Sequence, residues 1–408
     1  MSATLNPNQK MNVKHERSPF DEDVNRRDVP ALKVHPAVLG PDGDELFAAG
    51  VADMDFRAPP AVLDALQERL EHGVFGYEAV PDGLLPALIA WLSRRHHWKV
   101  DESHILRAPN VLNSLAIAAC LFTQEGDGVI VQPPVFFDFF DILRENHRRL
   151  IPNPLVLEEG RYHVDFGDLE NKAADRHTKM IYLCNPHNPV GRVWTEGELR
   201  TLGDICAHHG VLVVSDEMHG DFTFSGHAYT PFASLGVDYA DNCITCLSPA
   251  KCFNIASCCS AFTVITDDER REAFKAENSR LTVNKNNAFA NAAMEAAYRD
   301  GGPWLDDVRD YIEVNLRLVE NRLKDIPGVD LLEPEGTFLL WLDFRQLDLT
   351  PDALTAFLRQ EAKWSVTRGQ AFGEQGAGFA RLNIACTRAK LDAALDALET
   401  AVAALAGR

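Results

Sequence analysis

The chain has 408 residues, 46% of them hydrophobic, which is the composition of a folded protein long enough for two domains. Its formal net charge of −20 argues against nucleic acid or an anionic membrane as the main partner. The N-terminal residues lack the apolar core of a signal peptide, and no apolar run is long enough to span a membrane. We therefore predict a cytoplasmic protein.

Residues 1–46 are polar, charged and Pro-containing, and we expect them to form an arm with little structure of its own. The spacing of apolar residues then predicts helices at 61–71, 83–96 and 111–122. Short β-branched runs then predict strands that alternate with helices, and they lie at 128–132, 180–184, 211–215 and 260–266. This alternation predicts a mainly parallel sheet covered by helices.

Residues 304–323 predict a long helix that bridges to a second, smaller α/β domain. The elements expected there are strands at 337–344 and 380–384 and helices at 351–361 and 389–405. We therefore predict an α/β fold in three parts. These are an N-terminal arm (1–46), a large domain with the parallel sheet (47–300) and a small C-terminal domain with the bridging helix (301–408).

The nine cysteines are odd in number and scattered, which does not fit a secreted disulfide framework. Cys243 and Cys246 form a CxxC pair inside an apolar run, which favours core packing over a redox or metal role. The histidine pairs 96–97 and 208–209 occupy adjacent positions, which point away from each other on a helix. We expect these histidines to be surface residues, and no metal site is predicted.

Three polar residues follow predicted strands of the sheet, and ligands of open parallel sheets bind at the carboxyl ends of strands. Asp216 and Asn188 come after two successive strands, and Lys251 lies among small and apolar residues after the next. A buried carboxylate requires a cation, and apolar surroundings lower the pKa of a lysine and favour a nucleophilic amine. Singly, these residues also fit a helix cap, a turn residue and a surface lysine. Their order on consecutive strand ends favours a shared site.

Seven motifs resemble those of one enzyme family and occur in its order: Val51-Ala-Asp-Met-Asp-Phe56, Gly73-Val-Phe-Gly-Tyr77, Asn185-Pro-His-Asn-Pro-Val-Gly-Arg-Val-Trp194, Ser215-Asp-Glu-Met-His219, Ser248-Pro-Ala-Lys251-Cys-Phe-Asn254, Pro334-Glu-Gly-Thr337 and Arg381-Leu-Asn383. From about residue 47 onward, the chain resembles fold-type I pyridoxal 5′-phosphate (PLP) enzymes of the class I/II aminotransferase superfamily. The resemblance is closest to the MalY/PatB cystathionine β-lyase (C–S lyase) branch.

The resemblance implies PLP as the cofactor and a role for each candidate residue. Lys251 is implied to hold PLP as a Schiff base and, once displaced by substrate, to remove the Cα proton. Asp216 would keep the pyridine nitrogen protonated, and Asn188 and His219 would contact the phenolic oxygen. Arg381 is implied to clamp the substrate α-carboxylate, where bidentate geometry favours arginine, with a surface ion pair as the alternative.

The remaining implied contacts concern the phosphate and the ring of the cofactor. The amides of Val111 and Leu112, at the start of a predicted helix, and the hydroxyl of Ser248 are implied to bind the phosphate. Phe136 would lie over the ring, where relatives usually have a tyrosine. Tyr77 is implied to reach the phosphate of the neighbouring subunit, so the resemblance implies a homodimer with shared active sites.

The sequence departs from the family pattern close to the lysine. Ser257 and Cys258 replace a glycine and a bulky apolar residue, and Cys259 stands where many fold-type I enzymes have an arginine against the phosphate. Lys285 is either a compensating cation or a solvated residue, and Gly50 replaces a tryptophan. How the phosphate charge is balanced is therefore open.

Three functions are compatible with these residues. A C–S β-lyase acting on cystathionine or a cysteine S-conjugate would release a thiol, pyruvate and ammonia by α,β-elimination. An aminotransferase would use the same residues to pass the α-amino group to a 2-oxo acid. The third is a non-catalytic binding protein, since MalY-like chains also act on regulatory partners, but the complete catalytic set argues against this as the sole function. The closer resemblance favours the lyase.

Overall fold

A seven-stranded sheet forms the centre of the larger part of the molecule, with strand order β2-β10-β9-β8-β7-β3-β4. The computed structural model describes residues 18–283 and 286–407. The strands are β2 (Ile105–Ala108), β3 (Gly128–Val131), β4 (Arg149–Pro152), β7 (Thr178–Cys184), β8 (Leu212–Asp216), β9 (Cys243–Leu247) and β10 (Ala261–Val264). Only β10 pairs antiparallel, with β2 and β9, among the strands of this sheet. The predicted mainly parallel sheet is confirmed.

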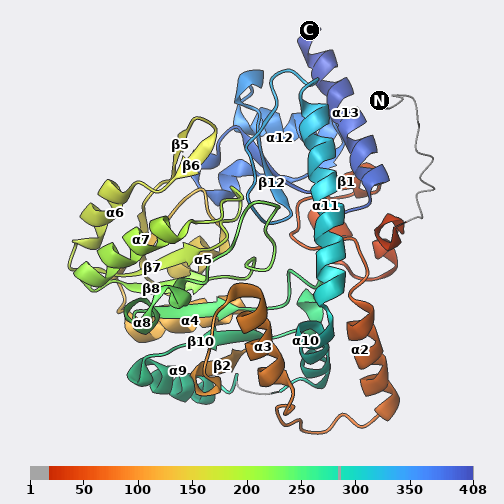
Figure 1. Cartoon of the computed structure of the whole chain (residues 1–408). Coiled ribbons are helices and arrows are strands. Elements are labelled where there is room, and N and C mark those ends of the chain that lie inside the picture. The colour runs from red at the N-terminus through yellow and green to blue at the C-terminus, as the bar shows by residue number, and fades with distance from the viewer. Residues whose placement is uncertain (1–17, 284–285, 408) are drawn as a thin grey trace, which may run out of the picture.

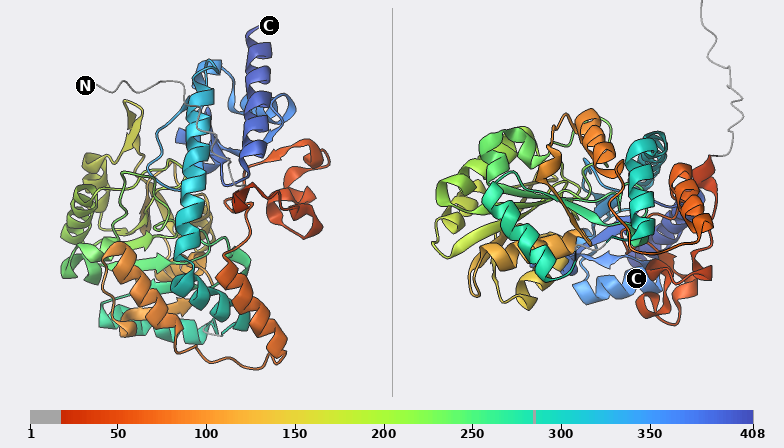
Figure 2. Two further views of the ribbon diagram at one scale, coloured as in Figure 1. Left: turned by 45° about the vertical axis from the view of Figure 1, so that its right-hand side comes forward. Right: turned by 90° about the horizontal axis from the view of Figure 1, so that it is seen from below.

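Helices cover both faces of this sheet, as the view from below shows (Figure 2). Val129 and Val131 of β3 pack in one apolar cluster with α4 (Val111–Phe122), α5 (Asp138–Glu145) and α9 (Asp268–Arg280). Ile130, between them, packs on the opposite face with α6 (Phe166–Ala173) and α7 (Glu196–His209). Because both faces are buried, the strands are apolar along their whole length instead of alternating.

The remaining helices of this part lie beside the sheet or connect its strands: α2 (Pro60–His72), α3 (Leu84–His96), α8 (Val237–Asp241) and α10 (Ala288–Asp300). A hairpin of β5 (Val156–Glu158) and β6 (Arg161–His163) projects at the upper left of the view in Figure 1. No helix in the described ranges is both long and apolar enough to cross a membrane.

Helix α11 (Gly302–Leu323) connects the two sheets and is about 33 Å long at 1.5 Å per residue (Figure 1). Beyond it, an antiparallel sheet is formed in the order β11 (Asp330–Leu331), β12 (Leu339–Asp343), β15 (Phe379–Asn383) and β14 (Thr367–Arg368). Helices α12 (Pro351–Gln360) and α13 (Arg388–Ala406) accompany this sheet. The predicted smaller α/β part is confirmed, while the exact domain boundaries stay a prediction.

The described part of the N-terminal arm consists of short helical turns, of which α1 (Pro36–Leu39) is one, and residues 1–17 lie outside the described range. Phe20 anchors the segment, because its ring packs edge-on against Phe56 at 5.2 Å and in a tilted arrangement against Tyr311 of α11 at 5.6 Å. Strand β1 (Phe47–Ala48) then pairs in parallel with β13 (Trp364–Ser365). The N-terminal segment therefore lies against the smaller, C-terminal part.

Candidate active site

Three neighbouring strands bring the predicted residues to one edge of the large sheet. Asp216 is the last residue of β8, and it pairs in register with Cys184 of β7 and Cys246 of β9. The turn that contains Asn188 leaves β7 at this level, and the segment leading to Lys251 leaves β9. The carboxyl ends of parallel strands thus gather the three residues, as their order in the sequence predicted.

Lys251 is an amine in a sheltered position without an acidic partner. Its Nζ donates a hydrogen bond to the carbonyl oxygen of Ala52 at 2.8 Å, and no carboxylate in the described part of the chain lies within ion-pairing distance. Burial lowers the pKa of Lys251, and the positive charge of Arg381 lowers it further, although Asp53 and Asp216 partly oppose this. A lowered pKa increases the fraction of neutral, nucleophilic amine.

Asp216 is a buried carboxylate, 7% exposed, whose Oδ1 accepts a hydrogen bond from the amide of Met218 at 3.1 Å. Burial raises the pKa of Asp216 to about 6, against the weaker opposing effects of that amide and of Lys251. A carboxylate held in this way favours a cationic or protonated partner, which is what a pyridine nitrogen provides.

Arg381 is a cation in β15 of the smaller sheet that reaches across to the large sheet. Its Nη1 donates to Oδ1 of Asn188 at 2.8 Å, its Nη2 donates to the Gly50 carbonyl at 2.8 Å, and its Nε is buried without a partner. The side chain lies over the ring of Phe372 and pairs with no acid among the described residues. Burial lowers the pKa of Arg381 to about 9. Since Arg381 is only 3% exposed, a surface ion pair is excluded, and its charge is available for a carboxylate ligand.

His219 follows Asp216 by three residues and faces the same space. Burial, followed by the charges of Lys251 and Arg381, lowers the pKa of His219 to about 3, so the ring is neutral. Its Nδ1 is buried without a hydrogen-bond partner, and the ring contacts Phe338 edge-on at 6.1 Å. A neutral ring with an unused nitrogen fits a ligand that offers a hydroxyl or phenolic oxygen.

The predicted phosphate turn lies at the N-terminus of α4. Asn110 caps the helix, since its side chain accepts from the amide of Asn113 at 2.8 Å, and the amides of Val111 and Leu112 are the first two of the helix. Such amides have no acceptor inside their own helix and lie at its positive end. The hydroxyl of Ser248 donates to the Ser260 carbonyl at 2.9 Å, so it must rotate to serve a phosphate.

Two implied residues lie at the margin of this group. Phe136 is half-buried beside α5, with its ring 6.0 Å from that of Phe139. Tyr77 is 109% exposed in the single chain and belongs to no group of residues at the sheet edge. Lys285 lies outside the described residues.

The departures from the family pattern have different surroundings. Ser257 is exposed, and Cys258 is half-buried against the core. The Cys259 sulfur lies 3.6 Å from the Ser248 hydroxyl, and burial raises the pKa of this thiol to about 11, so position 259 carries no charge near pH 7. Gly50 contributes the carbonyl that binds Arg381.

The loop 50–56 contacts the site through the carbonyls of Gly50 and Ala52, and its sequence motif alone indicated no such role. The side chain of Asn254 binds the Met54 amide and carbonyl, both at 3.0 Å, and the Phe56 carbonyl at 2.7 Å. Asn383 of β15 donates to the carbonyls of Val51 and Asp53 at 2.7 and 2.6 Å. Asn254 and Asn383, each the last residue of a family motif, hold the loop whose Ala52 carbonyl contacts Lys251.

Asp138 is a further residue that sequence reasoning missed. It is the first residue of α5, soon after Phe136, and it lies close enough to Lys251 and Asp216 to interact electrostatically with both. Burial and the neighbouring Asp141 raise the pKa of Asp138. No pattern in the sequence distinguished it from an ordinary acidic residue in a first helical turn.

The other candidates of the sequence lie elsewhere. Cys243 and Cys246 are unpaired and buried in β9, which confirms core packing. His97 and His208 are exposed, as predicted. His96 is not a surface residue, because its side chain is only 10% exposed, and its Nε2 lies 2.7 Å from a carboxylate oxygen of Asp221. The rings of His208 and His209 do not point apart: their centres are 4.7 Å apart, in the last turn of α7. With Glu170 of α6 they form a group close enough to hold a metal ion.

Comparison with known proteins agrees with this geometry. Residues 46–398 match the family model for aminotransferase class I and II. Cystathionine β-lyase PatB of Bacillus subtilis is 43% identical over 86% of this chain and 91% of its own length, and the protein MalY of Escherichia coli is 33% identical over 88% and 93%. Cystalysin from Treponema denticola, whose crystal structure contains PLP, superposes with a TM-score of 0.90 at 32% identity over 95% of this chain and 99% of its own. The chain therefore belongs to the aminotransferase class I and II family, within its cystathionine β-lyase branch.

Proposed function

We propose that this protein is a PLP-dependent carbon–sulfur β-lyase that cleaves cystathionine or another cysteine S-conjugate into a thiol, pyruvate and ammonia. The observation that carries the proposal is a set of charges, on half-buried Lys251 and on buried Asp216 and Arg381, that face one space without neutralising partners. The 43% identity with PatB over most of both chains favours the lyase over the aminotransferase.

The residues at the sheet edge fit PLP group by group. Lys251 offers an amine to the aldehyde, Asp216 an acid to the pyridine nitrogen, and Asn188 and His219 polar atoms to the phenolic oxygen. The first amides of α4 and the hydroxyl of Ser248 would hold the phosphate. When bound, PLP supplies an electron sink that stabilises negative charge at the substrate Cα.

The protein's own residues position the substrate and move its proton. Arg381 binds the α-carboxylate through two N–H groups, which fixes the direction of the Cα–H bond. Lys251, whose lowered pKa increases its neutral fraction, accepts the Cα proton as a general base. The Cβ–S bond then breaks, its electron pair leaves with the sulfur, and the sulfur takes up a proton to become the thiol. One water hydrolyses the remaining three-carbon fragment to pyruvate and ammonia. The loop 50–56 lies against the lysine and holds it through the Ala52 carbonyl.

The two enzyme activities are separated by one experiment. The purified protein with its cofactor is incubated with cystathionine and with cysteine S-conjugates, without any 2-oxo acid. Continuous release of pyruvate and thiol is expected. A single half-turnover that resumes only when a 2-oxo acid is added would contradict the lyase and identify an aminotransferase.

We also propose a homodimer with shared active sites. Tyr77 is fully exposed in the single chain and lies on a loop with three other exposed apolar residues, Val74, Phe75 and Val80. Exposed apolar groups of this kind are typical of an interface, which supports a second subunit that receives Tyr77. The nine free cysteines favour a reducing compartment, so we propose a cytoplasmic enzyme.

A further inference from the structure

A cavity of about 210 Å³ lies beside the predicted phosphate turn, and Arg107 of β2 lines it. Strand β2 pairs with β10, and Ala108 lies opposite Ala261. Ala261 is the residue that directly follows the Cys259-Ser260 segment. Pro109, which also lines the cavity, precedes the residue that caps α4. The cavity therefore adjoins both the start of α4 and the segment that follows the lysine.

Arg107 is a half-buried guanidinium whose charge is not neutralised. Its Nη1 donates to Oδ1 of Asn286 and its Nη2 to Oδ1 of Asn291 at 2.7 Å, and both acceptors are neutral amides. Its Nε is buried without a partner, and no acid in the described part of the chain forms an ion pair with it. It is the one charged side chain among the described residues that line the cavity. A cation in such a place is costly to the fold unless an anion joins it.

The phosphate of PLP needs a positive charge that compensates its own negative charge. The start of α4 supplies about half a positive charge, and the hydroxyl of Ser248 supplies none. Cys259 is an uncharged thiol, because burial raises its pKa to about 11. A phosphate near neutral pH carries about −1.5 to −2, so most of its charge is left without compensation from these groups.

The same contacts connect Arg107 with the loop that carries Tyr77. Asn286 donates through Nδ2 to the carbonyl of Glu78 at 3.0 Å, and Asn291 donates to that of Ala79 at 3.3 Å. Arg107 is thus held between the loop that follows Tyr77 and the start of α4. Both of these elements are implied in phosphate binding by the family resemblance.

We infer that Arg107 supplies the cation that faces the cofactor phosphate, from strand β2 instead of from position 259. This inference rests on the proposed PLP site. Arg107 acts as a positioning residue: it touches no reacting atom and contributes to the affinity for the phosphate group alone.

Binding of PLP and of pyridoxal, which lacks the phosphate, to the cofactor-free protein tests this role by absorbance titration. Arg107→Gln should weaken PLP binding about 10- to 100-fold, since hydrogen bonds to a charged group contribute about 1.5–3 kcal/mol. Pyridoxal binding should change less than about 2-fold, because the variant leaves the ring site intact. Arg107→Lys should recover part of the loss. Arg271→Gln is the matched control, a partly buried arginine at the other end of β10 that binds the carbonyls of Ile265 and Thr266.

Equal weakening of both ligands, or unchanged PLP binding, would overturn the inference. If Arg107→Gln does not fold, Arg107→His is used instead. The PLP affinity of this variant, divided by that of the wild type, should be higher at pH 6 than at pH 8. The same ratio for pyridoxal should not rise. A pH-independent ratio would count against Arg107. Failure of the wild-type protein to bind either compound would contradict the PLP site itself, whatever the variants do.

Discussion

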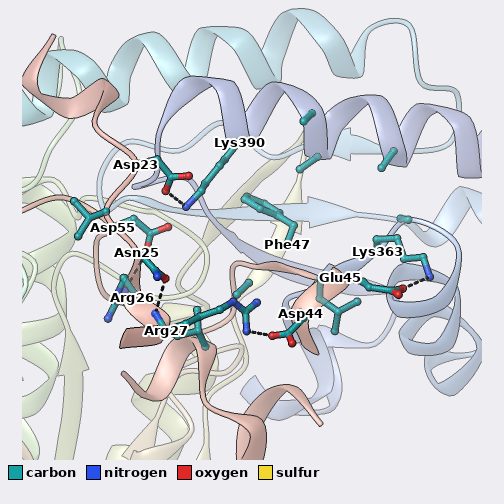
Figure 3. A pocket seen from close by; sticks show the side chains of 18 residues that line it. Asp23, Asn25, Arg26, Arg27, Asp44, Glu45, Phe47, Asp55, Lys363 and Lys390 are labelled. Atoms are coloured by element: carbon teal, nitrogen blue, oxygen red, sulfur yellow. Dashed lines mark hydrogen bonds and ion pairs between the residues drawn. The ribbon is translucent and has the colours of Figure 1, made fainter. Parts of the chain in front are cut away.

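Two groups of charged residues in this molecule differ in how their charges are balanced. One lines a cavity of about 530 Å³ between the N-terminal segment and α13 (Figure 3). There the charges form ion pairs with each other: Asp23 with Lys390, Arg27 with Asp44, Glu45 with Lys363, and Arg26 with Asp55. The other group lies at the edge of the large sheet, where Lys251, Asp216 and Arg381 have no ion-pair partner in the described chain.

This difference separates structural charges from functional ones. Paired charges at a surface contribute little to stability and are screened by salt. Buried charges that remain unpaired destabilise the folded chain, so they indicate a site that a charged ligand completes. The size of the cavity is a poor guide here, because the 530 Å³ cavity is surrounded by ion pairs that already satisfy each other.

The largest effect is expected from Lys251→Ala. Without the amine, the bound cofactor should lose its lysine-dependent visible absorbance, and lyase activity should fall by about 10²–10⁴-fold or more. Lys390→Ala, which removes the lysine paired with Asp23 in the cavity beside α13, should keep both the absorbance and the activity. Unchanged absorbance in Lys251→Ala would show that another residue holds the cofactor.

Asp216→Asn should stabilise the cofactor-free protein while it weakens activity. The pKa of Asp216 in the folded protein, about 6, lies above the ordinary value of 3.8, so ionisation above pH 6 destabilises the fold. The variant should therefore be more stable than wild type at pH 8, by up to about 3 kcal/mol, since one pKa unit corresponds to about 1.4 kcal/mol. The difference should shrink as the pH falls from 6 towards 4.

Urea denaturation of the cofactor-free proteins at pH 8 and pH 4 measures this difference. Asp44→Asn is the control, because Asp44 is exposed and paired with Arg27, so this variant removes a surface carboxylate and no buried one. A loss of stability in Asp216→Asn at pH 8 would mean that the carboxylate is compensated inside the protein.

Arg381→Lys should raise the KM for the amino-acid substrate about 10- to 100-fold. A lysine keeps the charge but loses the two parallel N–H groups that match a carboxylate, and charged hydrogen bonds contribute about 1.5–3 kcal/mol. Steady-state kinetics of pyruvate release measures the change, with Arg27→Lys as the control. Arg381 has no role as a carboxylate clamp if KM stays the same.

The smallest effect is expected from Lys390→Ala, which breaks its ion pair with Asp23. Both side chains are largely solvated, with exposed fractions of 40% and 64%, so the free energy of unfolding should change by less than about 1 kcal/mol. A thermal or urea unfolding curve is sufficient. A larger loss would place this pair among the structural supports of the N-terminal segment.

Most of the fold could be predicted from the sequence because the central strands are buried on both faces. Runs such as Val129–Val131 are apolar throughout and are recognisable without their neighbours. The two edge strands were missed. Strand β2 contains Arg107 in its middle, and β4 begins with Arg149, ends with Pro152 and is largely exposed. Edge strands tolerate charges and proline, so they lack the pattern that identifies a central strand.

The site was predictable where residues follow strands, and unpredictable where contacts join distant segments. Lys251, Asp216 and Asn188 each follow a recognisable strand. The contact of His96 with Asp221 joins positions 125 residues apart, and periodicity carries no signal for it. The hydrogen bonds of Asn254 and Asn383 to the loop 50–56 also join segments far apart in the sequence, so no sequence pattern predicted them.

Arg381 also links the two sheets of the molecule. The residue belongs to β15 of the smaller sheet, yet its guanidinium holds Asn188 beside the large sheet and Gly50 in the loop between them. Because Nε has no partner and each Nη carries a second N–H, a carboxylate can bind Arg381 while both contacts stay in place. One side chain can therefore tie the two sheets together and still receive the substrate.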